Sequence, residues 1–415
     1  MILNNDKIVI GYDLADDYAQ ITYCIPDKKE PETLSLSGDS QHYNIPVCLF
    51  KRSEVNQWFF GKEAHNYALV EEGTLFDSLL ERAVLGQEME ADDEKFDPVA
   101  LLALFIKRSL SLMSKSTKKM KPGAIMFTVP ALTPRVIDVM KQMSALLDLK
   151  DCEIYFQGRE ESIYNYVINQ QQDLWRDDVV VYDFSHEKLR SYRFVRNIKT
   201  TPIVAFVENT EHELKKTDPD LDEGFLKVIR ETLGVKKVSS VYLIGEGFSG
   251  EWCQESLKEL CLGRRVFKGN NLFGKGACFA AGERYCNQKS DTMVFLGKDK
   301  LKANIGMKVK RGWEESYLAL LDGGENWYES KKECQIILNT GNSFPIWIIP
   351  LDGRNAKTIE IVLEDLPVRE DKKTRLFLKA FMIKEDCMQI NIKDMGFGEY
   401  EKSSGMEFQK QIQLS

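Results

Sequence analysis

Short apolar runs alternate with amphipathic stretches along the first two-thirds of the chain. Runs at 7–13, 124–130 and 178–183 are rich in β-branched and aromatic residues, which predicts buried strands. Further strands are predicted at 20–25, 45–50, 153–156, 190–195 and 238–244. Strands that alternate with helices predict a mixed α/β fold for this part of the chain.

Helices are predicted where apolar residues recur at intervals of three and four. Asp97 and Pro98 begin one such stretch, and Thr133 and Pro134 begin another, because these residue types suit the N-cap and the first position of a helix. The acidic segment 88–94 is predicted to be a solvated loop. The remaining helices are predicted at 160–168, 221–233, 251–260 and 276–282.

The pattern changes near residue 299, where short alternating or apolar runs follow one another without helical spacing. Turn signals such as Asp322-Gly323-Gly324 and Asp352-Gly353 separate these runs. The strands are predicted at 335–338, 346–349, 359–363 and 376–381. Residues 299–415 are therefore predicted to form an all-β sandwich.

Two of the predicted strands end in an aspartate, Asp13 and Asp183, and each runs directly into a turn. Both halves then continue with further strands and a helical stretch, which predicts an internal duplication with lobes at about 1–173 and 174–290. An aspartate at a strand end before a glycine-rich turn suits a metal-bound nucleotide. Both turns lack those glycines.

Composition and charge predict which kinds of partner the protein binds and where in the cell it is located. The formal net charge is -8, and 43% of residues are hydrophobic, so a folded chain is expected and nucleic acid is not the expected partner. The longest apolar stretch, near 99–106, is too short to span a bilayer, so the protein is predicted to be cytoplasmic. Nine cysteines without a CxxC pair and four scattered histidines predict reduced thiols and no zinc site.

The order of several short motifs resembles the actin-like ATPase superfamily and, most closely, the DnaK-type (70-kDa heat-shock) chaperones. The motifs are Gly11-Tyr12-Asp13-Leu14, Thr128-Val129-Pro130-Ala131, Val181-Tyr182-Asp183-Phe184, Leu243-Ile244-Gly245-Glu246-Gly247 and Gly274-Lys275-Gly276-Ala277. The resemblance implies two ribonuclease H-like lobes around a cleft at 1–290, an interdomain linker at 291–298, and a β-sandwich at 299–415 that resembles the substrate-binding β-domain. It includes no counterpart of the helical lid.

The same resemblance implies a nucleotide cleft. The residues that match its motifs are Asp13, Asp16, Asp183, Gly245, Gly247 and Gly276. They are candidates for binding ATP or ADP, with Mg²⁺ held by Asp13 and Asp183.

The chain differs from this family in the two loops that would bind the phosphate groups. Asp16 and Asp17 follow the first aspartate, and the second loop, 184–188, reads Phe-Ser-His-Glu-Lys instead of a glycine-rich turn. One carboxylate at roughly 6 Å opposes a unit negative charge by about 3 kcal/mol at an effective dielectric of about 20. Two such acids offset most of a micromolar affinity, worth roughly 8 kcal/mol, unless metal ions neutralise them.

Two further family positions are altered. Leu79 stands where the chaperones have a catalytic lysine, and the nearest cation along the chain is Arg82. Gly158-Arg159 replaces an expected Glu-Pro pair, although Glu160 or Glu161 would supply an acid if the register slips by two.

Three functional classes follow. The first is a pseudo-ATPase that acts as a protein- or peptide-binding scaffold or chaperone-like module. The second is an active ATP-dependent chaperone or actin-like ATPase with non-standard phosphate loops. The third is a small-molecule kinase of the same superfamily, which the predicted β-sandwich does not support.

Overall fold

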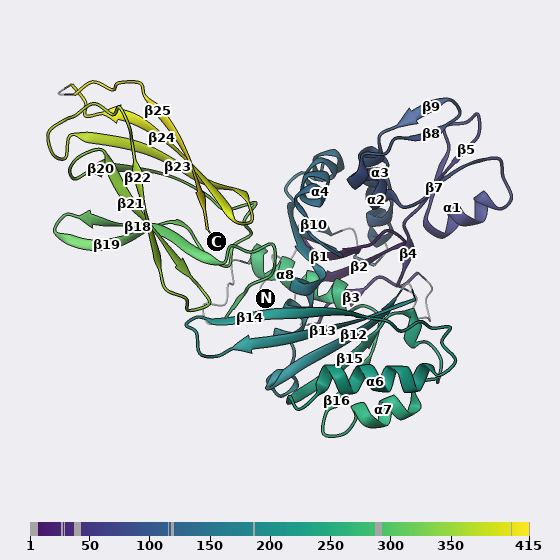
Figure 1. Ribbon diagram of the computed structural model, residues 1–415. Coiled ribbons are helices and arrows are strands. Elements are labelled where there is room, and N and C mark those ends of the chain that lie inside the picture. Colours follow the sequence, from purple (N-terminus) through teal and green to yellow (C-terminus); the bar gives the residue numbers. More distant parts are fainter. Residues whose placement is uncertain are drawn as a thin grey trace. The chain divides into compact units, whose positions relative to one another are not determined.

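The computed structural model describes residues 7–25, 28, 30–36, 43–114, 116–117, 120–185, 187–286, 293–399 and 401–414. The chain forms two compact units, whose elements are labelled in Figure 1. One unit comprises Met1–Val195 and Phe206–Ser290, and the second comprises Arg196–Ala205 and Asp291–Ser415. The first unit is mixed α/β and the second is rich in β-strands, as the sequence predicts.

The first sheet has the strand order β11-β10-β1-β2-β3, with β4 paired to β2. Its central strand, β1 (Lys7–Leu14), runs parallel to β10 (Lys121–Val129) and antiparallel to β2 (Tyr18–Cys24). The outer strands are β3 (Glu32–Thr33), β4 (Ile45–Pro46) and β11 (Glu153–Gly158).

The second sheet has the order β16-β15-β12-β13-β14-β17. Its central strand, β12 (Asp178–Ser185), runs antiparallel to β13 (Lys188–Asn197) and parallel to β15 (Val238–Ile244). The outer strands are β14 (Ile203–His212), β16 (Arg265–Lys268) and β17 (Met293–Phe295). Apart from β4 and β17, the two sheets share one strand order.

Eight α-helices are described, and the predicted caps of two are confirmed. The Asp97 side chain accepts a hydrogen bond from the Val99 N–H at 3.1 Å, and the Thr133 hydroxyl accepts one from the Val136 N–H at 3.3 Å. The helices are α1 (Gly61–Ala68), α2 (Leu79–Leu85), α3 (Pro98–Ser111), α4 (Pro134–Leu147), α5 (Arg159–Ile168), α6 (Leu221–Leu233), α7 (Gln254–Leu260) and α8 (Leu272–Tyr285).

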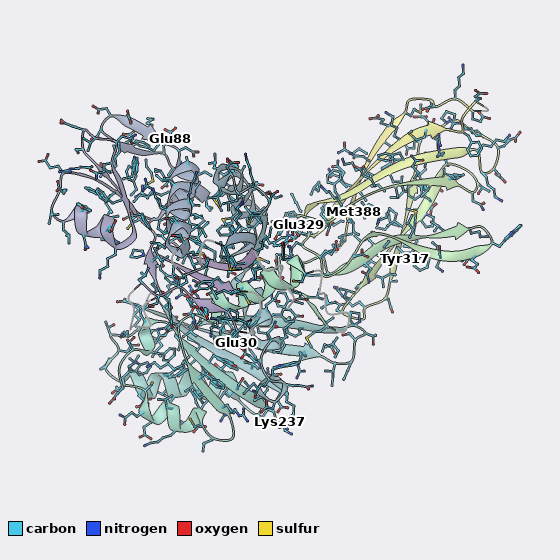
Figure 2. The ribbon with its side chains drawn as sticks, turned by 180° about the vertical axis from the view of Figure 1, so that it is seen from behind. Glu30, Glu88, Lys237, Tyr317, Glu329 and Met388 are labelled. Atoms are coloured by element: carbon cyan, nitrogen blue, oxygen red, sulfur yellow. The ribbon has the colours of Figure 1, made fainter. Side chains whose placement is uncertain are left out.

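The predicted acidic loop at 88–94 is wrong, because a hairpin of β8 (Met89–Ala91) and β9 (Glu94–Phe96) occupies it. Asp92 and Asp93 both have positive φ, 50° and 62°, which suits a tight hairpin turn. Glu88, labelled in Figure 2, forms an ion pair with Lys95 across the hairpin at 3.0 Å. The acids therefore lie on a solvated strand pair.

The single strand predicted at 45–50 is also wrong. It is divided into β4 and β5 (Leu49–Arg52), and β5 pairs with β6 (Trp58–Phe60) and β7 (Gly73–Phe76) in a separate small sheet. The chain changes partner at Val47, whose N–H donates to the Asp17 carbonyl. In addition, α7 begins three residues later than predicted.

Close packing of α8 connects the two halves of the first unit. A Cβ atom at Gly276 would lie 2.0 Å from the carbonyl oxygen of Ser162 in α5. A Cβ at Gly11 in β1 would lie 2.3 Å from the Gly274 carbonyl oxygen. The small residues therefore allow the backbone of α8 to contact both a helix and a strand.

The second unit contains two four-stranded antiparallel sheets, ordered β19-β18-β21-β22 and β20-β23-β24-β25. Alternate residues are buried, for example Ile346 and Met388, the latter labelled in Figure 2. The strands are β18 (Ala303–Arg311), β19 (Glu314–Leu321), β20 (Lys331–Leu338), β21 (Ser343–Pro350), β22 (Lys357–Val362), β23 (Thr374–Lys384), β24 (Cys387–Gly396) and β25 (Glu407–Gln413).

The predicted linker at 291–298 contains β17, which pairs in parallel with residues 203–205 of β14. Its first two residues, 291 and 292, lie outside the described residues. Within the described parts of the chain, no helix combines the length and apolar character needed to cross a membrane. All nine cysteines are free thiols.

Candidate functional site

Asp13 and Asp183 approach one another around a buried arginine. Asp13 is 1% exposed and Asp183 is 2% exposed. Nε of Arg159 lies 3.4 Å from Oδ1 of Asp13, and its Nη1 lies 4.0 Å from Oδ2 of Asp183. We call these three residues the Arg159 cluster.

The strand register places Arg159 at this position. Asp13 of β1 pairs with Thr128 of β10, which pairs with Gln157 of β11. These strands are parallel, so their carboxyl ends lie at one edge of the sheet. Arg159 follows Gln157 by two residues and begins α5 there.

Further contacts hold the guanidinium in place. Nη2 of Arg159 donates a hydrogen bond to the Tyr18 hydroxyl at 2.9 Å. The guanidinium carbon lies 4.5 Å from the ring centre of Phe273 and 5.7 Å from that of Tyr18, in the range of cation–π contacts. The side chain is 4% exposed. Arg159 is thus both buried and fixed by its neighbours.

Burial controls the ionisation of the cluster. It raises the pKa of Asp13 and of Asp183, and the positive charge of Arg159 opposes this rise. Burial acts to lower the pKa of Arg159, but Asp13 and the neighbouring acids hold it well above its ordinary value. The guanidinium therefore stays protonated, and its one positive charge lies beside two acidic side chains.

One oxygen of Asp183 lacks a hydrogen bond. Oδ1 accepts one from the Ser185 hydroxyl at 2.6 Å. Oδ2 is buried and has no hydrogen-bond partner among the described residues. A buried acceptor without a donor carries a free-energy cost of about 1–3 kcal/mol, more for a charged group.

A cavity of about 400 Å³ adjoins Asp183. One wall is ordered by Gln20, whose Nε2 donates to Oδ1 of Asn44 at 2.6 Å and to the carbonyl of Asn270 at 2.7 Å. The lining residues are Tyr18, Gln20, Tyr43, Asn44, Asp183, Ser185, Ile244, Gly245, Glu246, Ser249, Asn270 and Phe273. The lining thus combines carboxylates, amides, hydroxyls and aromatic rings.

The glycines expected to bind nucleotide allow close protein packing. Gly245 lines the cavity with φ +97°, and a Cβ there would lie 2.5 Å from the Phe184 carbonyl oxygen. A Cβ at Gly247 would lie 2.4 Å from the Phe184 ring. Gly276 lies in α8 against Ser162. All three positions exclude a side chain because protein atoms are already there.

Other positions at which the chain departs from the DnaK-type chaperones have structural contacts. Asp16 is exposed, and its Oδ1 accepts a hydrogen bond from the Glu81 N–H at 2.8 Å in the first turn of α2. Leu79 is fully buried in the core of the first unit. Arg82 forms an ion pair with Asp77 at 3.4 Å.

These residues do not fit a magnesium-bound nucleotide, which is the ligand that the resemblance implies. A divalent cation at about 4 Å from Arg159 would be repelled by roughly 8 kcal/mol at an effective dielectric of about 20. Among the described residues, no group of three or more His, Cys, Asp or Glu side chains is placed to hold a metal ion. The guanidinium stands where the two aspartates would need a metal.

Comparison with known families covers nearly the whole chain. The model described as "Family of unknown function (DUF5716) C-terminal" matches residues 30–298. The chain belongs to the DUF5716 family. A second model, "Domain of unknown function (DUF8552)", matches residues 300–414 of this DUF5716 chain. No curated protein matches it significantly.

Sequence reasoning did not identify Arg159 as part of the site in this DUF5716 protein. The available signal was a charge reversal, because Gly158-Arg159 stands where the resemblance places a Glu-Pro pair. Tyr18 and Gln20 were also missed. They lie on β2, in a run whose period indicates only a buried strand.

Proposed function

We propose that this protein is a DnaK-like pseudo-ATPase of the actin-like fold that serves as a protein- or peptide-binding scaffold. In this proposal, the two six-stranded sheets belong to ribonuclease H-like lobes around a cleft. The β-rich second unit is the module that contacts the partner.

Sheet topology supports the actin-like assignment. Each sheet places a hairpin partner and a third strand on one side of a central strand, and two further strands on the other side. Asp13 and Asp183 occupy corresponding places near the ends of the central strands. The duplicated arrangement agrees with the order of the resembling motifs.

The position of Arg159 carries the claim that nucleotide hydrolysis is lost. Its charge is already matched by Asp13 and Asp183, and its side chain is 4% exposed, so it is poorly placed to bind a phosphate group. Leu79, buried in the core, supplies no charge for a γ-phosphate. The cleft therefore repels both the metal and the anion of a metal-bound nucleotide.

Exposed apolar side chains on the second unit support the scaffold role. Tyr317 on β19, Ile337 on β20 and Val362 on β22 are 42%, 52% and 44% exposed. These strands stand at sheet edges, where an extended peptide can add a strand through main-chain hydrogen bonds.

A phosphate-release assay on the full chain tests the proposal, with Asp183→Asn as the matched control for contaminating activity. We expect equal release from the two proteins with ATP and Mg²⁺. We also expect binding to an array of extended peptides to be unchanged by ATP or ADP. Turnover that Asp183→Asn abolishes, or peptide release by ATP, would establish an active enzyme instead.

A further inference from the structure

Gln20 is a buried polar side chain in the wall of the cavity beside Asp183. It lies on β2 and is 2% exposed. Its Nε2 donates hydrogen bonds to Oδ1 of Asn44 at 2.6 Å and to the main-chain carbonyl of Asn270 at 2.7 Å. Asn44 directly precedes β4, and Asn270 lies shortly before α8. One buried amide thus holds together two cavity-lining segments from distant parts of the chain.

This arrangement leaves a side-chain amide of each asparagine available to a ligand. Oδ1 of Asn44 accepts from Gln20, so its Nδ2 is the uncommitted end of that side chain. Asn270 is held through its main chain, so its own side-chain amide is not used by Gln20. Within the residues that the structure describes, no hydrogen bond occupies Nδ2 of Asn44 or the side-chain amide of Asn270.

Two hydroxyl groups add to the uncommitted lining. Tyr43 and Ser249 line the cavity, and neither side chain forms a hydrogen bond within the described part of the chain. The ring of Tyr43 is half-buried, so it contributes an apolar surface as well as a hydroxyl group. Uncommitted polar groups therefore come from three separate segments of the chain, at 43–44, 249 and 270.

The charged side chains at the cavity have partners already. Asp183 accepts a hydrogen bond from Ser185 and lies beside Arg159. Glu246 is also engaged with other groups of the protein. No lysine, arginine or histidine occurs among the described residues that line the cavity. The groups that remain for recognising a ligand are therefore neutral amides and hydroxyls.

We infer that this cavity binds a neutral polyhydroxylated small molecule, of which monosaccharides are the simplest examples. Hydroxyl groups of such a molecule both donate and accept hydrogen bonds, which matches the amides and hydroxyls of the lining. The Tyr43 ring offers an apolar surface to the carbon face of the ligand. A cavity of about 400 Å³ is in the size range of small-molecule sites. The inference goes beyond the scaffold role and does not depend on it.

Ligand-observed NMR on the full chain tests this inference, with glucose, galactose and mannose as probes. The amino sugar and the uronate of each hexose serve as matched cationic and anionic counterparts. We expect saturable binding of at least one neutral hexose, and binding weaker by about fivefold or more for its charged counterparts. Absence of binding by all three neutral hexoses, or equal binding of a charged counterpart, would overturn the inference.

Asn44→Ala and Asn270→Ala locate the site, with Asn66→Ala as the matched control. Asn66 is an exposed residue of α1 that does not line the cavity. Each lining substitution removes one amide and is expected to weaken hexose binding about threefold or more, whereas the control should not change it. Asn270→Ala keeps the main-chain carbonyl that Gln20 binds, so the wall of the cavity stays in place. Equal effects of all three substitutions would contradict a specific site.

The outcome is distinguishable from that of the proposed function. If the chain neither binds a neutral hexose nor hydrolyses ATP, the ligand site is overturned and the pseudo-ATPase proposal stands. ATP hydrolysis that Asp183→Asn abolishes overturns the pseudo-ATPase proposal, and the hexose titrations still decide the ligand site.

Discussion

At the scale of single residues, the proposed loss of nucleotide binding depends on Arg159. Asp13 and Asp183 are the residues that sequence alone places at the site, and their burial raises the pKa of each. The arginine places a positive charge beside two acidic side chains that are buried in the first unit. Its role is thus both to stabilise the fold and to occupy a ligand position.

Replacing this arginine should destabilise the first unit strongly. Arg159→Met leaves two buried acids without their cation, which is expected to lower the free energy of unfolding by about 3–5 kcal/mol. Chemical denaturation measures this free energy of unfolding. Arg176→Met, at an 81% exposed side chain, is the matched control and should change stability by less than about 0.5 kcal/mol. Equal losses would show that the Arg159 cluster has no special role.

The same substitution should introduce a pH dependence. Because the folded-state pKa of Asp13 and Asp183 is raised, their protonated forms favour the fold, and this stability is lost as pH rises from about 4 through the raised pKa values. Removing Arg159 takes away the largest influence that opposes the upward shift of these two pKa values. The penalty of Arg159→Met should therefore be larger at about pH 7 than at about pH 4. A penalty that shrinks with rising pH contradicts the assigned ionisation.

At the scale of elements, helices were predicted better than their connections. The apolar period and the bounds of α6 agree at Leu221–Leu233, because one amphipathic face decides the helix locally. The hairpin of β8 and β9 was missed because its acids resemble a loop, and its turn depends on the positive φ of Asp92 and Asp93. The contact between Arg159 and Asp13 depends on how the strands pair, and strand register cannot be predicted from a local sequence pattern.

Asp16 shows how an apparent ligand serves an element instead. Its carboxylate accepts the Glu81 N–H of α2, whose own N-cap, Ser78, makes no side-chain cap hydrogen bond. Asp16→Ala should lower the free energy of unfolding by about 1 kcal/mol, measured by denaturation, whereas Asp16→Asn keeps an acceptor and should cost less. Two equal losses would remove the capping explanation.

At the scale of the whole molecule, the second unit has an internal ion pair of its own. Asp394 is fully buried, and it accepts hydrogen bonds from Arg369 at 2.8 and 2.7 Å and from the Ser404 N–H at 2.8 Å. These donors, Arg369 first, hold the pKa of Asp394 well below its ordinary range. The pair ties the segment before β23 to the end of β24.

Asp394→Ala should destabilise the second unit by about 3–5 kcal/mol, because it removes the carboxylate closest to the buried Arg369 and leaves only the more distant Glu401 to balance its charge. Hydrogen exchange followed by mass spectrometry should show faster exchange in peptides from β23, β24 and β25, with the sheets of the first unit as internal control. Uniform acceleration across both units would show that they unfold as one, against the division into two compact units.

Acid should act on the second unit in the direction opposite to its effect on the Arg159 cluster. A lowered pKa means that the stability contributed by Asp394 is present above about pH 4 and is lost as pH falls through its folded-state value. Exchange in β24 should therefore accelerate in wild type below about pH 4, after correction for intrinsic rates, and Asp394→Ala should lack this step. A step retained in the variant would assign it to another group.

The central claim is that Arg159 closes the cleft to a metal-bound nucleotide. Calorimetric titration of the wild-type chain with Mg·ATP tests it most directly. No saturable heat is expected up to millimolar nucleotide. Saturable binding with a micromolar dissociation constant, weakened by Asp183→Asn, would contradict the claim.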